Sequence, residues 1–428
     1  MSSSVAELDI DTIGAGGDGV GRFEGMVVFV PRTAPGDRVR VRLDARKRFA
    51  RGTVEEILTP SAARVAPPCA HYRIDRCGGC QLQHIEYVAQ LEMKARIIHD
   101  SLTRIGKRDV PPPVVTPSER QWRYRTKLTL AMRRSGRGHW VVGLHPYDDA
   151  GAVFQLRDCP IADDRVIDVW RQIMAASAHF PDGDEFRASV RLAENSERSP
   201  GDGSAGGAAL VVMEGGHRWP QRAAFFAAVP GAASLWWRPA HRARVLVATR
   251  GSNASTGPSF AQVNPTVAAV LHAYVVERAL AHRPATVVDA YAGSGATAIA
   301  LARVGVRVAA IDADADAVAA CAPRLPDESH AVAGRVEHLL EVELPADVVL
   351  LNPPRTGVHE HVATILQGVT APPRAIIYVS CDPATLARDL ARLPRYRIAS
   401  VHAFDMFPQT AHVETVCELV PDSRTGAA

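Results

Sequence analysis

Cys381 is the residue whose surroundings point most directly to chemistry. An apolar run over residues 376–379 stops at polar residues and a proline, and a helical pattern follows over 384–390. This order predicts a buried strand that ends in a turn before a helix. Ligands bind at the carboxyl ends of strands in parallel α/β sheets, so a thiol placed there can act as a nucleophile. Taken alone, a free cysteine is more often a small core residue, and the rest of the chain has to decide.

A nucleoside site is predicted between residues 286 and 312. An apolar strand pattern over 286–290 runs into a glycine turn that ends at Gly295, and a helical pattern, a second strand over 307–311 and Asp312 follow. Glycines let the backbone approach a ligand closely, and an acid at this spacing accepts hydrogen bonds from ribose hydroxyls. Asp289 before a short Gly-x-Gly is more typical of S-adenosylmethionine (SAM) methyltransferases than of NAD enzymes.

Polar residues beside this turn complete the predicted cofactor site. Gln262 precedes a helical segment and offers both an acceptor and donors. Asn352 follows an apolar strand pattern and opens an Asn-Pro-Pro-Arg sequence, which in many methyltransferases faces the methyl-accepting base; a rigid strand-ending turn is the other interpretation. The candidate cofactor contacts are Gln262, Tyr291, Asp312 and Asn352.

Four cysteines form a candidate metal centre. They are Cys69, Cys77, Cys80 and Cys159. Four thiolates can hold either a tetrahedral zinc or a [4Fe–4S] cluster. The spacing is asymmetric, unlike the two CxxC knuckles of a zinc ribbon, and it lacks the CxxxCxxC of radical-SAM enzymes. We therefore favour the iron–sulfur cluster and keep zinc as the alternative, while Cys321 and Cys417 are expected in the core.

Length and composition predict a multidomain protein of 428 residues with 47% hydrophobic residues. Its apolar stretches are too short to span a bilayer, and the acidic start of the sequence lacks the cationic region of a signal peptide. We expect a cytoplasmic protein with no membrane partner, most simply a monomer. The predicted domains are a small β-barrel over 1–60, a central α+β domain with the cysteines over 61–258, and an α/β Rossmann-like domain over 259–428.

The N-terminal domain and two arginine-rich segments suggest an RNA partner. Short strand patterns with turn signals over residues 5–58 predict a small barrel of the kind that binds oligonucleotides. Val39, Val41 and Leu43 alternate with arginines, and a second basic cluster covers residues 120–137 with aromatic residues among it. Solvated strand faces would explain either cluster alone, whereas the two together favour a phosphate backbone.

Several of these sequences resemble one family. Residues 18–21, 28–31 and 35–37 resemble a TRAM domain, which occurs on RNA-modifying enzymes. The chain as a whole resembles the RNA uridine-5-methyltransferases that carry a TRAM domain and a [4Fe–4S] cluster, best known from enzymes of 23S ribosomal RNA. The matching segments are 77–84, 260–264, 289–295, 352–357, 378–389 and 405–414.

The resemblance implies a mechanism and its residues. Cys381 would be the nucleophile that adds to C6 of uracil, and Glu414 the base that removes the C5 proton. SAM would supply the methyl group, and the cluster would be structural or help to bind RNA. Three positions depart from the family: Asn352 stands where Asp is usual, Ala296 where Asn is common, and Asp312 where Glu is common.

Other functions remain open from the sequence. The substrate could be transfer RNA instead of ribosomal RNA. The Asn-Pro-Pro sequence suggests an exocyclic-amine methyltransferase of adenine, a chemistry that needs no cysteine. A non-catalytic RNA-binding protein with a relict fold would bind no SAM, and a TRAM-bearing methylthiotransferase is disfavoured by the missing CxxxCxxC.

Overall fold

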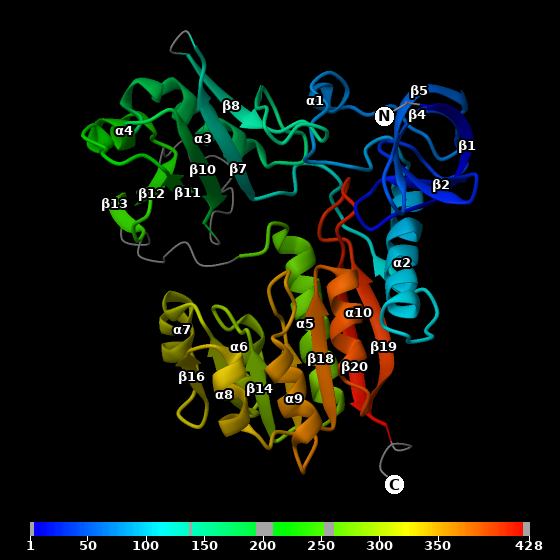
Figure 1. Ribbon diagram of the computed structural model, residues 1–428. Helices are drawn as coiled ribbons and strands as arrows, with labels where there is room; N and C mark the ends of the chain where they lie inside the picture. Colours follow the sequence, from blue (N-terminus) through cyan, green and yellow to red (C-terminus); the bar gives the residue numbers. More distant parts are fainter. Residues whose placement is uncertain (1–3, 137–138, 194–208, 252–260, 423–428) are drawn as a thin grey trace.

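The N-terminal part is a closed five-stranded barrel in the order β1-β2-β3-β5-β4 (Figure 1). The computed structural model describes residues 4–136, 139–193, 209–251 and 261–422. The barrel strands are β1 (Ser4–Ile13), β2 (Gly19–Phe23), β3 (Met26–Val30), β4 (Arg38–Ala45) and β5 (Ala50–Thr59). Val39, Val41 and Leu43 point into the barrel core, as their alternation predicts. The predicted N-terminal barrel is confirmed.

The arginines on the outer face of β4 are paired with acids of the neighbouring strands. Arg40 contacts Glu7 of β1 at 2.9 Å and Glu56 of β5 at 2.5 Å, and Arg42 lies 3.7 Å from Glu55. These arginines look like a basic cluster in the sequence, since the acids that pair with them come from β1 and β5 and lie elsewhere in the chain. Exposed pairs of this kind add little stability, but they neutralise a face that was expected to be cationic.

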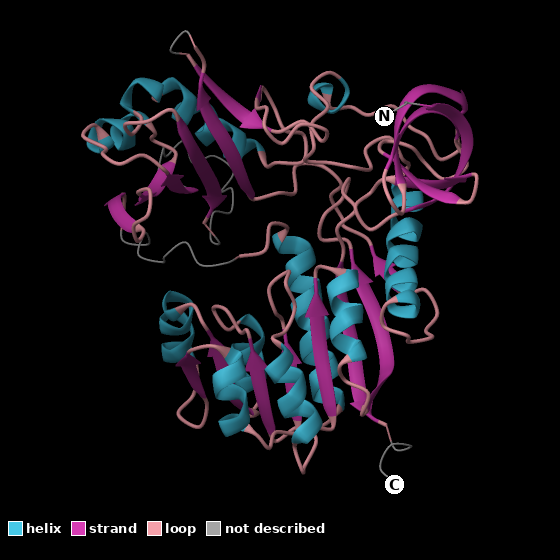
Figure 2. Ribbon diagram, viewed as in Figure 1, coloured by secondary structure: helices cyan, strands magenta, loops and turns pink. Residues whose placement is uncertain are grey.

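The central part is a seven-stranded sheet in the order β13-β12-β11-β10-β7-β8-β9, covered on one face by helices (Figure 2). One face of the sheet packs against α3 and α4 around a core that includes Trp170, Phe225 and Leu130. The elements are β7 (Lys127–Arg134), β8 (Trp140–Leu144), β9 (Phe154–Gln155), α3 (Asp164–Ala175), β10 (Glu185–Leu192), β11 (Ala209–Glu214), α4 (Arg222–Ala228), β12 (Ala232–Arg238) and β13 (Val245–Thr249).

The C-terminal part is an eight-stranded sheet in the order β16-β15-β14-β17-β18-β20-β19-β6, with helices on both faces. Its strands pair in parallel except β20, which is antiparallel to both β18 and β19. The strands are β14 (Thr286–Ala290), β15 (Arg307–Asp312), β16 (His330–Ala333), β17 (Val348–Leu351), β18 (Ala375–Ser380), β19 (Tyr396–Phe404) and β20 (Glu414–Pro421). The helices are α5 (Pro265–Ala281), α6 (Ala296–Arg303), α7 (Ala315–Cys321), α8 (Val336–Leu339), α9 (Glu360–Gly368) and α10 (Pro383–Ala391).

Residues 87–116 add a helix and a strand to this C-terminal sheet. Strand β6 (Val114–Thr116) pairs in parallel with β19, and α2 (Tyr87–Arg104) packs beside α10, where Ile98 and Leu102 enter the core. This segment falls within the predicted central domain (61–258), because nothing in its local pattern indicates which sheet it joins. The domain boundaries stay a prediction, and the one between 258 and 259 lies outside the described residues. Across the part of the chain that the structure describes, no helix has the length and apolarity to cross a bilayer.

A buried ion pair ties α2 to the C-terminal sheet. The Lys94 Nζ atom lies 2.5 Å from Asp405 Oδ1 and 3.1 Å from the carbonyl oxygen of Phe407, and both charged side chains are fully buried. Removing one partner of such a pair leaves an uncompensated charge inside the protein.

We therefore expect Lys94→Met to lower the free energy of unfolding by about 3–5 kcal/mol, measured by urea denaturation. The matched control is Lys107→Met at an exposed position, which should stay within about 0.5 kcal/mol of the parent protein. Equal stability of the two variants would contradict a structural role for the pair.

Candidate active site

Cys381 and Glu414 meet where β18 ends and β20 begins. The two strands are antiparallel with Ser380 opposite Thr415, so the next pair in the register is Cys381 with Glu414. Cys381 is half-buried and Glu414 is 4% exposed. Two residues that lie 33 positions apart in the sequence are thus brought side by side by strand pairing.

The environment shifts the pKa of both groups. Burial raises the pKa of Glu414 to about 7, opposed by the positive charge of Arg355 and by a hydrogen bond from the Gln262 amide. Burial and then the neighbouring Glu414 raise the pKa of the Cys381 thiol to about 11, while the charge of Arg355 and its hydrogen bond to the thiol act in the opposite direction. A buried acid that titrates near neutral pH beside a thiol is an arrangement suited to acid–base chemistry.

Arg355 is a further site residue, and its role is not evident from the sequence. It follows β17 in the Asn-Pro-Pro-Arg sequence, is exposed, and acts electrostatically on Cys381, Glu414 and His412. Its position directly after the predicted strand could have marked it as a site residue. The motif does not indicate, however, that the charge of Arg355 acts on Cys381 at the end of β18. The structure makes Arg355 the cation shared by the thiol and the acid.

The glycine turn after β14 and the acid that ends β15, Asp312, also lie at one edge of the sheet. Asp312 Oδ2 accepts a hydrogen bond from the Gly293 backbone at 2.7 Å, and Oδ1 accepts one from Asp314 at 2.8 Å. Gly295 has φ +81°, and a Cβ there would lie 2.2 Å from Cys321 Sγ, so both conformation and space require glycine. Asp289 is buried, accepts a 2.5 Å hydrogen bond from Thr297, and has its pKa raised to about 6 by burial.

The other three predicted cofactor residues lie in different surroundings. Tyr291 has φ +65° and packs against the core, and burial and then Glu337 raise the pKa of its hydroxyl to about 12. Asn352 follows β17 with an exposed side chain, and its backbone N–H donates to the Ala290 carbonyl at 3.2 Å. Gln262 lies instead against Glu414. The cofactor contacts of these residues stay predictions.

The four predicted metal ligands are buried together. Burial raises the pKa of Cys77 to about 12 and that of Cys159 to about 11, and Cys69 adds to both increases. Burial and then Cys159 also raise the pKa of Cys80, so the four thiols act on one another. Among the residues that the structure describes, no three His, Cys, Asp or Glu side chains are arranged to hold a single metal ion.

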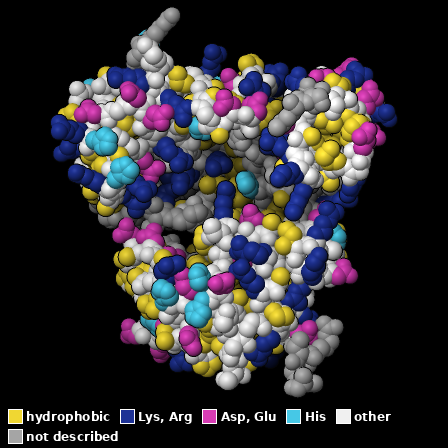
Figure 3. Space-filling view, viewed as in Figure 1, with side chains coloured by type: hydrophobic (Ala, Val, Ile, Leu, Met, Phe, Trp, Pro, Cys, Tyr) yellow, Lys and Arg dark blue, Asp and Glu magenta, His cyan; other side chains and the backbone are white. Residues whose placement is uncertain are grey.

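Basic side chains gather around the hollow between the upper and lower parts of the molecule (Figure 3). Burial and then Arg191 and Arg125 lower the pKa of Lys127, and Arg125 also acts on His412, two residues before Glu414. The central domain is joined to this region by a 2.8 Å hydrogen bond from the Thr126 backbone to Val263. This part of the second basic cluster therefore faces the candidate site.

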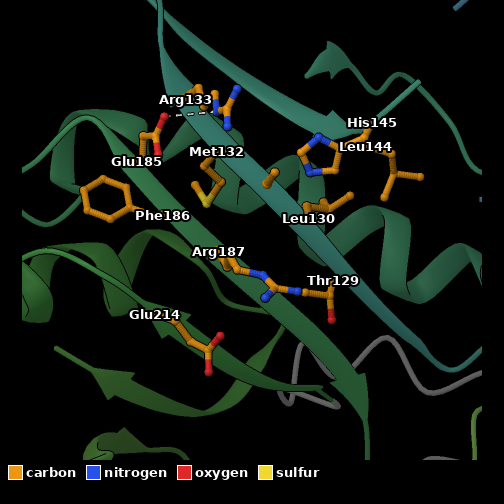
Figure 4. Close-up of a pocket in the computed structure, with 11 residues that line it drawn as sticks. Thr129, Leu130, Met132, Arg133, Leu144, His145, Glu185, Phe186, Arg187 and Glu214 are labelled. Atoms are coloured by element: carbon orange, nitrogen blue, oxygen red, sulfur yellow. Dashed lines mark ion pairs between the residues drawn. The ribbon is translucent and has the colours of Figure 1, made fainter. Parts of the chain in front are cut away.

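A separate cavity of about 510 Å³ lies on the outer face of the central sheet (Figure 4). Thr129, Arg187 and Glu214 line it, and Arg133 forms an ion pair with Glu185 at 3.2 Å across its rim. Cys381 and Glu414 are absent from its lining, so the cavity is distinct from the candidate active site.

The fold is that of a class of RNA-modifying methyltransferases. The structure superposes on the Pyrococcus abyssi tRNA (uracil-54, C5)-methyltransferase, solved with S-adenosyl-L-homocysteine, with a TM-score of 0.69 over 97% of this chain and 100% of that one. The sequence identity is 23%, so this likeness establishes the shared architecture.

Sequence relatives identify the family. RNA methyltransferases of Thermosynechococcus vestitus and Synechocystis are 33% and 34% identical to this chain over 98% and 97% of its length, covering 98% and 95% of their own. The tRNA (uracil-5-)-methyltransferase family matches residues 334–420, and the TRAM domain matches residues 1–54. The chain belongs to the RNA methyltransferases of the uracil-5 family.

Loss of Arg355 should make the thiol less reactive. In Arg355→Met, the pKa of Cys381 should rise because a stabilising cation is lost, and each unit is about a tenfold loss of thiolate. Alkylation of Cys381 by iodoacetamide at pH 8, followed by mass spectrometry of its peptide, should slow about tenfold. Arg397→Met on the exposed face of β19 is the matched control, and an unchanged rate in Arg355→Met would contradict the assignment.

Proposed function

We propose that the protein methylates C5 of a uridine in structured RNA, with SAM as methyl donor and a covalent bond between Cys381 and uracil C6. The observation that carries the proposal is the pairing of a half-buried thiol with a buried acid at the β18–β20 junction. Ribosomal RNA of the 23S type is the first target to test, from the resemblance of the cysteine segment. Transfer RNA is the second, because the Pyrococcus protein acts on it.

The first step needs the thiolate of Cys381. The Cys381 thiol is protonated at neutral pH, and the charge of Arg355 favours the ionised form. The thiol proton leaves to solvent, because Cys381 is only partly buried. The thiolate adds to C6 of uracil, forming the S–C6 bond and turning C5 into an enolate carbon. C5 then takes the methyl group, which uracil cannot do unaided.

The second step needs the carboxylate of Glu414. After methylation C5 still carries its proton, and Glu414 removes it so that the C5–C6 double bond re-forms, the S–C6 bond breaks and the thiolate returns. A base with a pKa of about 7 is partly ionised at neutral pH and still holds a proton well. The buried position of Glu414 therefore suits the step that releases the product.

The edge of the sheet fits SAM as the methyl donor. Asp312, the last residue of β15, accepts two backbone hydrogen bonds, and an acid at this position can also accept from ribose hydroxyls. The positive φ values of Gly293 and Gly295 bring bare backbone to the same edge. In our proposal Asp312, Tyr291, Gln262 and Asn352 hold the cofactor or the base next to it.

The four cysteines of the candidate metal centre are buried, and their thiols act on one another electrostatically. Four thiolates can hold either a tetrahedral zinc or a [4Fe–4S] cluster. We propose that Cys69, Cys77, Cys80 and Cys159 hold a [4Fe–4S] cluster, as the family resemblance implies, and that the cluster would supply structural cross-linking.

An adenine N6-methyltransferase is the competing enzyme. It would use Asn352 at the carboxyl end of β17 but would need neither the thiol of Cys381 nor the acid of Glu414. The specific environment of these two groups favours the uracil reaction. The target base must leave its stack to reach the half-buried thiol, so a looped or flipped uridine is the expected substrate.

Blocking the base should trap the intermediate. With labelled SAM and total RNA from cells that lack this gene, Glu414→Gln should accumulate a covalent RNA–protein adduct, seen as a labelled band on denaturing gels. Cys381→Ser should form no adduct, and an active Cys381→Ser would exclude this chemistry in favour of methylation of an exocyclic amine.

The same acid should make product release depend on pH. In the unaltered enzyme, release of product should slow about tenfold for each pH unit below 7, since Glu414 must be ionised.

The metal assignment predicts iron and acid-labile sulfide in protein purified without oxygen. Cys159→Ser should lose most of both, because one of four ligands is removed, whereas Cys321→Ala should keep them. Elemental analysis that finds stoichiometric zinc and no sulfide would overturn the cluster while leaving the methyltransferase proposal intact.

A further inference from the structure

The segment that leads into Glu414 is irregular but almost completely buried. Residues 405–413 connect β19 to β20, and Asp405, Gln409 and Thr410 are each at most 3% exposed. Gln409 has φ +70°, a conformation that side chains rarely adopt without support. A buried segment without regular structure must find partners for its polar backbone elsewhere in the protein. We call residues 405–413 the base loop.

The amide of Gln90 supplies one of these partners and also bonds the Gln409 side chain. Its Oε1 atom accepts from the Gln409 backbone N–H at 3.1 Å, and its Nε2 atom lies 3.0 Å from Gln409 Oε1. The two hydrogens of Nε2 are shared between this oxygen and the carbonyls of Leu82 at 3.1 Å and Ile85 at 2.8 Å. Gln90 is fully buried on α2, so its amide joins the base loop to the segment that follows the cysteines.

The cysteine segment contacts the base loop directly. The backbone N–H groups of Gln81 and Leu82 donate to the Gln409 carbonyl at 3.1 and 3.0 Å. The Gln81 side chain accepts from the Ala411 N–H at 3.4 Å and donates to the Gly78 carbonyl at 2.8 Å. Since Gln81 follows Cys80, the base loop is held by the same stretch that supplies two of the proposed cluster ligands.

We propose that Gln90 is a positioning residue for Glu414, acting through Gln409 in the base loop. This inference rests on the proposed function, because it assumes that Glu414 is the base. The role of Gln90 is to fix the loop that leads directly into Glu414, the first residue of β20. A misplacement of about 1 Å at such a group can cost about 100-fold in rate.

This role has a kinetic signature that general destabilisation lacks. Formation of the S–C6 bond and transfer of the methyl group use Cys381, whereas Glu414 acts only when the C5 proton is removed and the S–C6 bond breaks. A displaced base loop therefore slows release more than addition. The methylated covalent adduct should accumulate even though the nucleophile and the acid are both present.

The test compares Gln90→Leu with Glu414→Gln and the parent enzyme. With labelled SAM and total RNA from cells that lack this gene, Gln90→Leu should turn over about 10- to 100-fold more slowly. It should form the adduct at nearly the parental rate and accumulate it, as Glu414→Gln does. Gln172→Leu is the matched control, since the Gln172 amide bonds the Gly231 backbone in the central domain, and it should release product normally.

The outcomes separate the two proposals. If Glu414→Gln itself accumulates no adduct, the assignment of the base fails. If Glu414→Gln accumulates it but folded Gln90→Leu turns over normally, or loses addition and release equally, the positioning role of Gln90 is overturned. Should Gln90→Leu not fold, Gln409→Met removes only the side-chain bond from Gln90 and keeps the backbone bonds. It must then accumulate adduct to a smaller extent, and its failure to do so overturns the inference.

Discussion

The reversed direction of β20 is the constraint on which the site depends. Because β20 is antiparallel to β18, the end of one strand meets the beginning of the other, and a thiol and an acid become neighbours. A shift of one residue in this pairing would turn the Glu414 side chain to the opposite face of the sheet. The same pairing buries Glu414 between β18 and β19, and that burial raises its pKa to about 7. Strand register and acid–base behaviour therefore have one physical origin.

The N-terminal half of the chain builds much of what surrounds this pair. Helix α2 covers the sheet beside α10, β6 extends it past β19, and the buried Lys94–Asp405 pair anchors the segment before β20. Tyr124 of the central domain donates to the Pro408 carbonyl at 3.0 Å. The TRAM barrel is tied in as well, since Arg32 hydrogen bonds to the carbonyls of Tyr72 and Cys77. The last domain in the sequence is thus contacted by segments that precede it, and the barrel is tied to the cysteine segment.

The sequence predicted the features that depend on local patterns. The strands β14, β15, β17 and β18 were recognisable as apolar runs that end at polar residues, and the barrel was recognisable by its alternation. The features that depend on distant pairing were not predictable in this way. Gln90 and Gln409 are 319 positions apart, and each is unremarkable in its own segment. The acids opposite the β4 arginines and the charge of Arg355 near Cys381 became evident only once the strands were placed.

The central claim is that Cys381 forms a covalent bond with a uracil ring. The most direct measurement is to incubate the protein with SAM and RNA that contains 5-fluorouridine. Fluorine replaces the C5 proton that the base would remove, so the thiol cannot be eliminated and the adduct persists. Peptide mass spectrometry of the trapped complex should place the nucleotide on Cys381, and Cys417→Ala should trap equally well. A methylated RNA product formed without any adduct, or an adduct on a different cysteine, would contradict the account.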